Sequence, residues 1–311
     1  MSNNMSASLK KLYRSFSEGI GRFMIPKEVQ LKIGSELDDI GNANDIVNHV
    51  EVEGIDLNRP EIRELYNNTC SRLLFQEMKK QRNIQEIVEK TEVLLENEEN
   101  PSEEPVNQDW LTRFFNSVED VSEEKMQEIW SRILAQEVTN PNSFSLRTLD
   151  TVSKISKNEA LLFEEICKYI INLRGTYAVP NDDNICNKYN ISYKKILLLD
   201  ECGLIDASGT MRVTLTVNKE NPFQLIYGNK IVFGHAKTDK KVTIGIYKLT
   251  SIGIQMYKII LKQYNDDYLK SIEQFFVDNN NDMTFLEHMI VNELDNGQVM
   301  YNNVGKPLNE K

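Results

Sequence analysis

The most regular pattern of apolar residues runs from residue 109 to residue 163 and includes both tryptophans. Apolar positions three and four apart predict a series of short helices beginning near Asp109, Ser122, either Ser143 or Ser145, and Ser156, each of which is a good N-cap residue. Helices this short are marginal alone, so we expect them to pack on one another. Aromatic residues at this spacing are typical of a buried core rather than a ligand platform: Trp110, Phe114, Phe115 and Trp130.

Two longer helical patterns lie upstream. Residues 6–23 predict a basic amphipathic first helix, and Pro60 opens a helix that continues to Leu95 with a break at Asn83. The helix that begins at Pro60 offers a face for a second protomer, and packing within its own bundle is the alternative. Between residues 97 and 106 the composition is acidic and proline-containing, which predicts a solvated linker between domains.

The first helix is a candidate surface for a membrane or a partner, because a basic amphipathic helix can lie on anionic lipid or against another helix. Packing of this helix into its own domain is the alternative. The candidate residues combine an apolar side with a basic rim: Leu9, Lys10, Lys11, Leu12, Arg14, Phe16, Arg22 and Phe23.

Residues 157–264 predict a module that contains strands. A helix through Ile171 is followed by a turn bounded by Gly175 and Pro180, a helical turn from Asn184 to Tyr189 and a helix from Tyr193 to Cys202. Alternating patterns then predict strands at 211–217, 223–233 and 242–249, before a helix capped by Thr250. This order is similar to a winged-helix domain. We expect two further helices over 265–296, one of them with Phe285, Leu286, Met289, Ile290 and Leu294 as its stripe, and a disordered tail over 297–311.

A winged helix can bind DNA through its third helix, which enters the major groove. The alternative function is therefore a DNA-binding regulator, with candidate contacts on that helix and on the wing: Tyr193, Lys194, Lys195, Lys240 and Lys241. The chain of 311 residues carries a net charge of −11, which argues against broad wrapping of nucleic acid but permits a local basic patch.

Two arginines lie beside apolar stripes in the central stretch. Arg113 and Arg147 are candidates for a structural clamp, on a carboxylate or on the carbonyls at a helix C-terminus, or for anion recognition.

The sequence carries no phosphate-binding loop, no glycine-rich dinucleotide turn and no zinc-protease motif, which argues against an enzyme. Its four cysteines lack metal-ligand spacing and it has three histidines, so we expect no metal, cofactor or disulfide framework. It also lacks an apolar run of 18 residues, so we expect a cytoplasmic protein, with a peripheral location on the inner membrane as the alternative.

The runs DWLTRFF, EEKMQEIWSRILAQEV and NPNSFSLRTLDTVSKIS resemble a family of uncharacterised bacterial proteins with a DWL-x-RFF and SFSLRTL signature. The match is strong from Asp109 to about Ile170. The resemblance implies no catalytic residues, and the family in turn resembles abortive-infection accessory proteins.

The sequence therefore predicts a mainly α protein of the α+β class. A helical region over 1–96, an acidic linker over 97–106 and a central bundle over 107–156 precede the winged-helix-like module over 157–264. The expected function is a non-enzymatic sensor or adaptor in phage defence. It would act through homo-oligomers, through a co-encoded protein or at a membrane surface.

Overall fold

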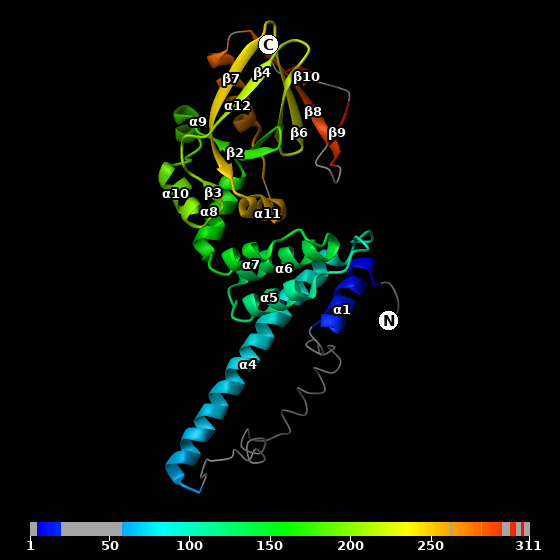
Figure 1. Ribbon diagram of the computed structural model, residues 1–311, viewed down its shortest axis with the longest axis vertical. Helices are drawn as coiled ribbons and strands as arrows, with labels where there is room; N and C mark the ends of the chain where they lie inside the picture. The colour runs from blue at the N-terminus through cyan, green and yellow to red at the C-terminus, as the bar shows by residue number, and fades with distance from the viewer. Residues whose placement is uncertain are drawn as a thin grey trace. The chain divides into compact units, whose positions relative to one another are not determined.

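The computed structural model describes residues 5–19, 58–261, 263–280, 282–293, 299–302 and 306–307. The chain divides into two compact units, Met1–Ser153 (unit 1) and Lys154–Lys311 (unit 2), each described here by itself. Figure 1 shows the course of the chain. Unit 1 is helical in its described part, and unit 2 combines helices with an antiparallel sheet, so the expected α+β class is confirmed.

Unit 1 contains one long helix and several short ones. Its described helices are α1 (Ala7–Gly19), α4 (Pro60–Leu95), α5 (Gln108–Val118), α6 (Glu124–Thr139) and α7 (Leu146–Val152). Helix α4 continues through Asn83, so the expected break is wrong: Asn83 is buried and its Nδ2 donates to the carbonyl of Glu119 at 2.8 Å. A tertiary partner thus satisfies the polar side chain that suggested the break.

The aromatic residues of the central stretch form the core of unit 1. Phe114 and Trp130 are fully buried, with ring centroids 5.5 Å apart in an edge-to-face arrangement. Trp110 stacks on Phe114 at 5.2 Å, and Phe16 of α1 packs edge-on against Phe115 at 5.4 Å. The prediction of a core rather than a ligand platform is confirmed.

Residues 97–106 lie inside unit 1 rather than between domains. The N–H of Ser102 donates to the carbonyl of Thr139 at 2.8 Å, and the N–H of Ser8 donates to Glu98 at 3.3 Å. Val106 is buried. An acidic, proline-containing segment can thus be fixed by backbone hydrogen bonds, which composition does not reveal.

Unit 2 is built on an antiparallel sheet. Its elements are α8 (Lys157–Cys167), β1 (Ile171–Leu173), β2 (Thr176–Pro180), α9 (Asp183–Lys188), α10 (Tyr193–Glu201), β3 (Ile205–Asp206), β4 (Arg212–Val217), β5 (Phe223–Tyr227), β6 (Lys230–Ala236), β7 (Lys240–Leu249), α11 (Ser251–Ile259), α12 (Asp266–Asn279), β8 (Met283–Glu293), β9 (Val299–Tyr301) and β10 (Lys306–Pro307). The strand order is β10-β8-β6-β5-β1-β2-β7-β3, with β4 paired to β7 and β9 paired to β8.

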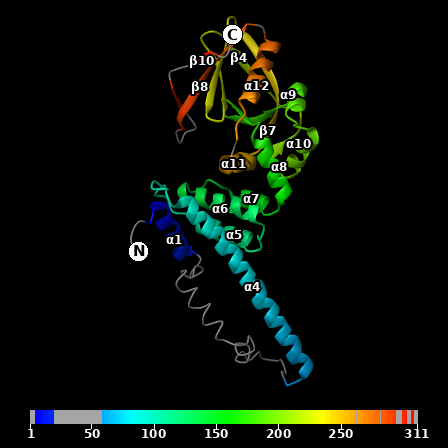
Figure 2. The same cartoon turned by 180° about the vertical axis from the view of Figure 1, so that it is seen from behind.

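Helix α12 lies against one face of this sheet (Figure 2). Its buried residues Tyr268, Leu269, Ile272 and Phe276 join the inward-facing strand residues in one core cluster. The ring of Phe276 lies 4.9 Å from that of Phe223 on β5. Buried hydroxyls find backbone partners, since the hydroxyl of Tyr268 donates to the carbonyl of Tyr169 at 2.7 Å.

Three sequence predictions in unit 2 are wrong. The second C-terminal helix is instead strand β8, in which Met283 and Phe285 are buried and the chain pairs with β6 over seven residue pairs. The turn expected between Gly175 and Pro180 contains strand β2, which pairs with β1. Within the expected disordered tail, β9 and β10 pair with β8. In each case a distant strand supplies the hydrogen bonds, so tertiary pairing overrides the local pattern.

Candidate functional site

The three signature segments of the central stretch meet at the backbone of one residue, Phe144. The indole Nε1 of Trp110 donates to the carbonyl of Phe144 at 2.9 Å, and the N–H of Phe144 donates to a carboxylate oxygen of Glu137 at 3.0 Å. The other oxygen of Glu137 accepts from the N–H of Asn142 at 2.7 Å. Asn142 has a φ of 67°, a left-handed conformation that asparagine tolerates. The signature thus forms a hydrogen-bonded joint that fixes the loop before α7.

Glu137 is the residue of this joint that the sequence did not single out. Its side chain is 1% exposed, and burial raises its pKa while the N–H groups of Asn142 and Phe144 oppose that rise. The available signal was an acidic residue at helical spacing from Trp130, Ile133 and Leu134, inside an apolar stripe. Its hydrogen bonds to Asn142 and Phe144 are structural, so this part of the central stretch holds the fold together.

The structure leaves both candidate arginines on the surface. Arg113 on α5 and Arg147 on α7 are exposed, and neither forms an ion pair with another residue in the described part of the chain. Within the described part of the chain, Arg113 and Arg147 therefore do not clamp a carboxylate. Anion recognition at Arg113 and Arg147 stays a prediction.

The first helix uses its apolar side within unit 1. Leu12 is 0% exposed and Phe16 is 3% exposed, so neither faces outward in the way that binding to lipid requires. Lys10 and Arg14 are exposed, Leu9 is half-buried, and the Nζ of Lys11 donates to the carbonyl of Ser102 at 2.7 Å. Arg22 and Phe23 lie outside the described residues. The arrangement fits the alternative in which this helix packs into its own domain.

The candidate DNA-binding residues are spread over two regions of unit 2. On α10, Tyr193 and Lys194 are exposed, while the Nζ of Lys195 lies 2.7 Å from a carboxylate oxygen of Glu165. The ring of Tyr193 lies 6.2 Å from that of Tyr247. Lys240 and Lys241 lie at the other end of the same strand β7, about seven residues or roughly 23 Å from Tyr247. These lysines do not form one continuous positive patch.

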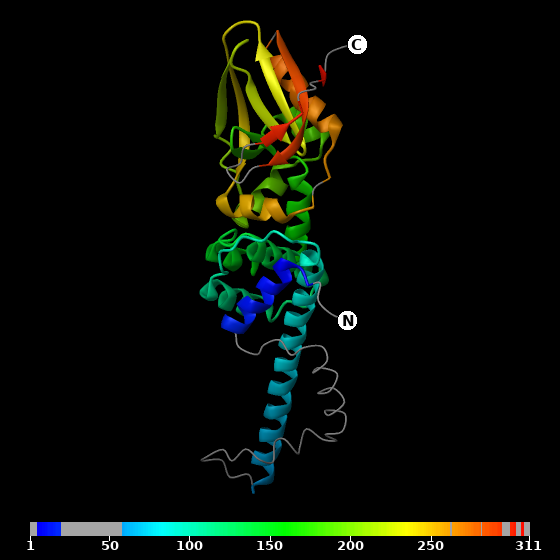
Figure 3. The same cartoon turned by 90° about the vertical axis from the view of Figure 1, so that its right-hand side faces the viewer.

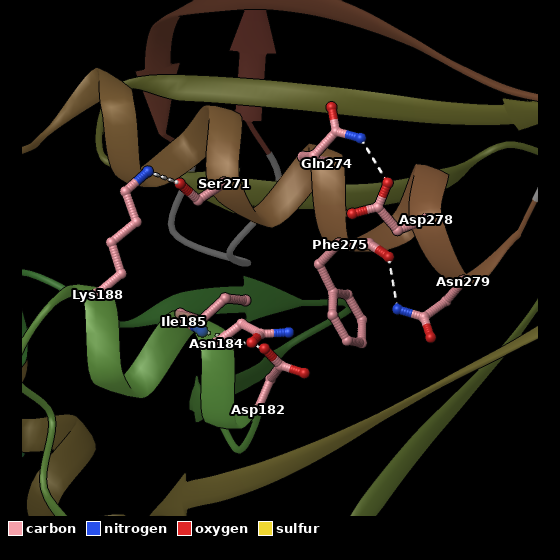
Figure 4. A pocket seen from close by; sticks show the side chains of 9 residues that line it. All are labelled: Asp182, Asn184, Ile185, Lys188, Ser271, Gln274, Phe275, Asp278 and Asn279. Atoms are coloured by element: carbon pink, nitrogen blue, oxygen red, sulfur yellow. Dashed lines mark hydrogen bonds between the residues drawn. The ribbon is translucent and has the colours of Figure 1, made fainter.

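A pocket of about 360 Å³ lies between α9 and α12 (Figure 4). Among its polar side chains, the Nζ of Lys188 donates to Ser271 at 2.8 Å, and Gln274 donates to Asp278 at 2.6 Å. Phe275 is its aromatic residue.

Chemistry elsewhere in the described residues is sparse. Burial and the nearby carboxylate of Glu159 raise the pKa of the Cys202 thiol to about 11, and burial raises the pKa of Cys186. Both thiols are therefore protonated at neutral pH and are poor nucleophiles. In the same residues, His, Cys, Asp and Glu side chains do not gather into a group of three that could hold a metal ion. None of the helices that the structure describes is long and apolar enough to cross a membrane.

Among the described residues of unit 1, most of the exposed large apolar side chains lie on helix α4. Asn83, Ile84, Ile87, Val88 and Leu95 are buried in the bundle, whereas the described side chains from Pro60 to Arg82 are all at least partly exposed. Figure 3 shows this first half of α4 extending past the other described helices of unit 1. Its exposed apolar side chains lie on more than one side of the helix: Leu65 at 64%, Leu73 at 49%, Leu74 at 48%, Phe75 at 71% and Met78 at 58%.

Comparisons with known proteins identify the family of this chain. A family model described as a protein of unknown function, DUF2806, matches residues 68–273. The search of curated proteins and the search of solved structures found no match. Because the family model covers more than half of the sequence, the chain belongs to the DUF2806 family.

Proposed function

Since this family has no assigned function to transfer, we propose that the chain is an interaction protein, and that it binds another protein through the first half of α4. The change in burial along one helix carries this proposal. After Arg82 the same helix buries Ile84, Ile87, Val88 and Leu95 and exposes Val93 and Leu94, whereas before Arg82 it buries none of its apolar residues.

The size and composition of the exposed surface support this proposal. Monomeric proteins seldom leave large apolar side chains in contiguous groups on the surface, and such groups mark binding sites. An apolar helix also binds well in a groove or against a second helix, with anchors at positions three, four and seven apart. Leu74, Phe75 and Met78 have this spacing on one side, and Tyr66, Thr69 and Leu73 have it on the other.

We expect a photo-reactive residue in place of Leu73 to cross-link the full-length protein to a defined partner in bacterial cells. The apolar surface at this position must be covered when the partner is bound. The measurement is the mass of the adduct, followed by reconstitution of the complex from purified components. Leu73→Glu should weaken that complex at least tenfold, since a charge would be buried in the interface.

Glu89 provides the matched control for this experiment. It lies on the same helix, and its side chain is exposed on the half that already packs in the bundle. A photo-reactive residue there should give no adduct. Adducts at Glu89 as abundant as those at Leu73 would mean that the cross-links report random collisions, and the proposal would fail.

Unit 2 supports a finer proposal, that it contains a winged-helix-like module. Helices α8, α9 and α10 come in the expected order, and β2, β7 and β3 lie side by side in the sheet. DNA binding is the alternative function for this module. The separation of Lys194 from Lys240 and the ion pair of Lys195 with Glu165 do not favour it.

The resemblance of the signature to abortive-infection accessory proteins supports a sensor or adaptor role in phage defence. If this is the role, bacteria that carry the intact gene should lower phage plating efficiency at least tenfold relative to bacteria that lack it. Leu73→Glu should abolish this protection, whereas Glu89→Gln should preserve it. Equal plating on all four strains would contradict the defence role, while leaving a different interaction possible.

A further inference from the structure

The free half of α4 continues the face that packs in the bundle. At 100° per residue, Ile62, Tyr66, Thr69 and Leu73 fall on the same side of the helix as Ile84, Ile87, Val88, Thr91 and Leu95. That side is covered by α6 in the second half of the helix, and α4 and α6 are the most extensively packed helices of unit 1. We call Ile62, Tyr66, Thr69 and Leu73 the free seam.

The spacing of the free seam is that of a helix packed against another helix. Its residues are separated by four, three and four positions, the repeat that sets the contact line of a two-helix coiled coil. Extending from Pro60 to Arg82, the free half spans about 34 Å at 1.5 Å per residue. The seam thus continues an established helix interface into a stretch long enough for a second helix.

We propose that the occupant of the free seam is the same stretch of a second copy of this chain, packed antiparallel. This inference rests on the proposed function, since it identifies the partner. In this register Ile62 lies opposite Leu73 of the second copy, and Tyr66 lies opposite Thr69 of the second copy. All seam residues therefore meet one another across the two-fold axis, with a large residue against a small one at the centre.

The flanking residues are compatible with this register. Arg63 comes beside Cys70 of the second copy, and Arg72 comes beside Leu65 of the second copy, so like charges are not opposed. The aliphatic part of an arginine can cover a leucine while its charge stays in water. Like-charge pairs across a helix interface would otherwise weaken it.

The bundle itself selects the antiparallel direction. From Asn83 onward the seam side of α4 is occupied by α6 of the same chain. In a parallel pair, the second copy would bring its own α6 to the same place, and the two would compete for the space between the α4 helices. An antiparallel pair uses the free half of each helix and directs the two bundles to opposite ends.

The test uses the full-length protein in solution. Static light scattering should give twice the chain mass for the parent, and Leu73→Glu should reduce this to one chain mass. Met78→Glu is the matched control, because Met78 is 58% exposed on the opposite side of the helix, and this variant should keep the dimer mass. Tryptophan fluorescence should be unchanged in both variants, since neither residue is buried and both tryptophans lie in the folded core.

The direction is tested by disulfide formation in a Cys70→Ser background. Differently tagged Ile62→Cys and Leu73→Cys proteins, mixed and oxidised, should join to each other and not to themselves. Disulfides that join Ile62→Cys to itself would overturn the antiparallel direction. If the parent protein is monomeric, a second copy does not occupy the free seam. Cross-linking at Leu73 to another protein would then still support the proposed function. The lack of any adduct at Leu73 would contradict both the proposed function and this inference.

Discussion

Glu137→Ala should lower the free energy of unfolding of unit 1 by about 3 kcal/mol, the magnitude expected when buried N–H groups lose a charged acceptor. The variant leaves the N–H groups of Asn142 and Phe144 without the carboxylate that binds them at 2.7 Å and 3.0 Å. It also opens a cavity inside α6, where Glu137 is 1% exposed. The loop that carries the signature would lose its fixed geometry first.

Urea unfolding followed by tryptophan fluorescence measures this effect without interference from unit 2, because both tryptophans lie in unit 1. Glu128→Ala is the control on the same helix. Its side chain is 41% exposed and pairs with Lys125 and Arg132, so its loss should cost less than about 1 kcal/mol. Equal midpoints for the two variants would show that Glu137 is not a structural joint. If Glu137→Ala does not fold, Glu137→Gln, which keeps one acceptor oxygen, should fold with reduced stability.

Glu273→Gln should make unit 2 more stable than the parent at pH 8, by up to roughly 3 kcal/mol if the full shift is expressed. Glu273 on α12 is 7% exposed, and its Oε1 is buried without a hydrogen-bond partner among the described residues. Burial and the neighbouring carboxylate of Glu287 raise its pKa to about 7, against the weaker opposing effect of Lys230 and Lys270. The nearby pair of Lys230 and Glu287, 2.7 Å apart, leaves Glu273 without a counter-ion of its own.

The direction of the pH dependence follows from this raised pKa. The folded state keeps the proton of Glu273 up to about pH 7, whereas the unfolded chain releases it near the ordinary value of 4.5. The contribution of Glu273 to stability is therefore complete below about pH 4.5 and declines as the pH rises to about 7. Glutamine stays neutral throughout, so the variant should lack this decline.

Labelling of the Cys167 thiol in urea measures the pH dependence of the stability of unit 2. Cys167 is fully buried in α8 and becomes reactive when unit 2 unfolds. The urea concentration at the labelling midpoint of the parent should decrease as the pH is raised from 5 to 8. The midpoint of Glu273→Gln should decrease less over the same range. Asp278→Asn on the same helix is the control, since Asp278 is exposed and should leave the pH profile of the parent intact. If the labelling midpoints of the parent and of Glu273→Gln changed equally with pH, ionisation of Glu273 would not be the source of the pH dependence.

Local periodicity determined much of the fold. The apolar stripes of α4, α5, α6 and α7 identified helices and their buried sides, because a helix that packs on a core must repeat its apolar residues every three or four positions. Alternation over residues 211–249 identified the strands there for the same reason, with a period of two. The aromatic core around Phe114 and Trp130 followed from these patterns alone.

Where the partners of a segment are distant in sequence, only the tertiary structure decided its conformation and contacts. Residues 283–293 contain apolar residues at spacings that suit a helix, yet β6 supplies a neighbouring strand and the segment is extended. Glu137 could be recognised as a joint only when the loop containing Phe144 was seen to fold back on it. Helix α4 shows the limit most clearly, since its seam has the same pattern on both halves. Periodicity defines which side of a helix packs, but not how much of that side is covered. Helix α6 covers only the second half of α4, so the same side of the first half stays exposed.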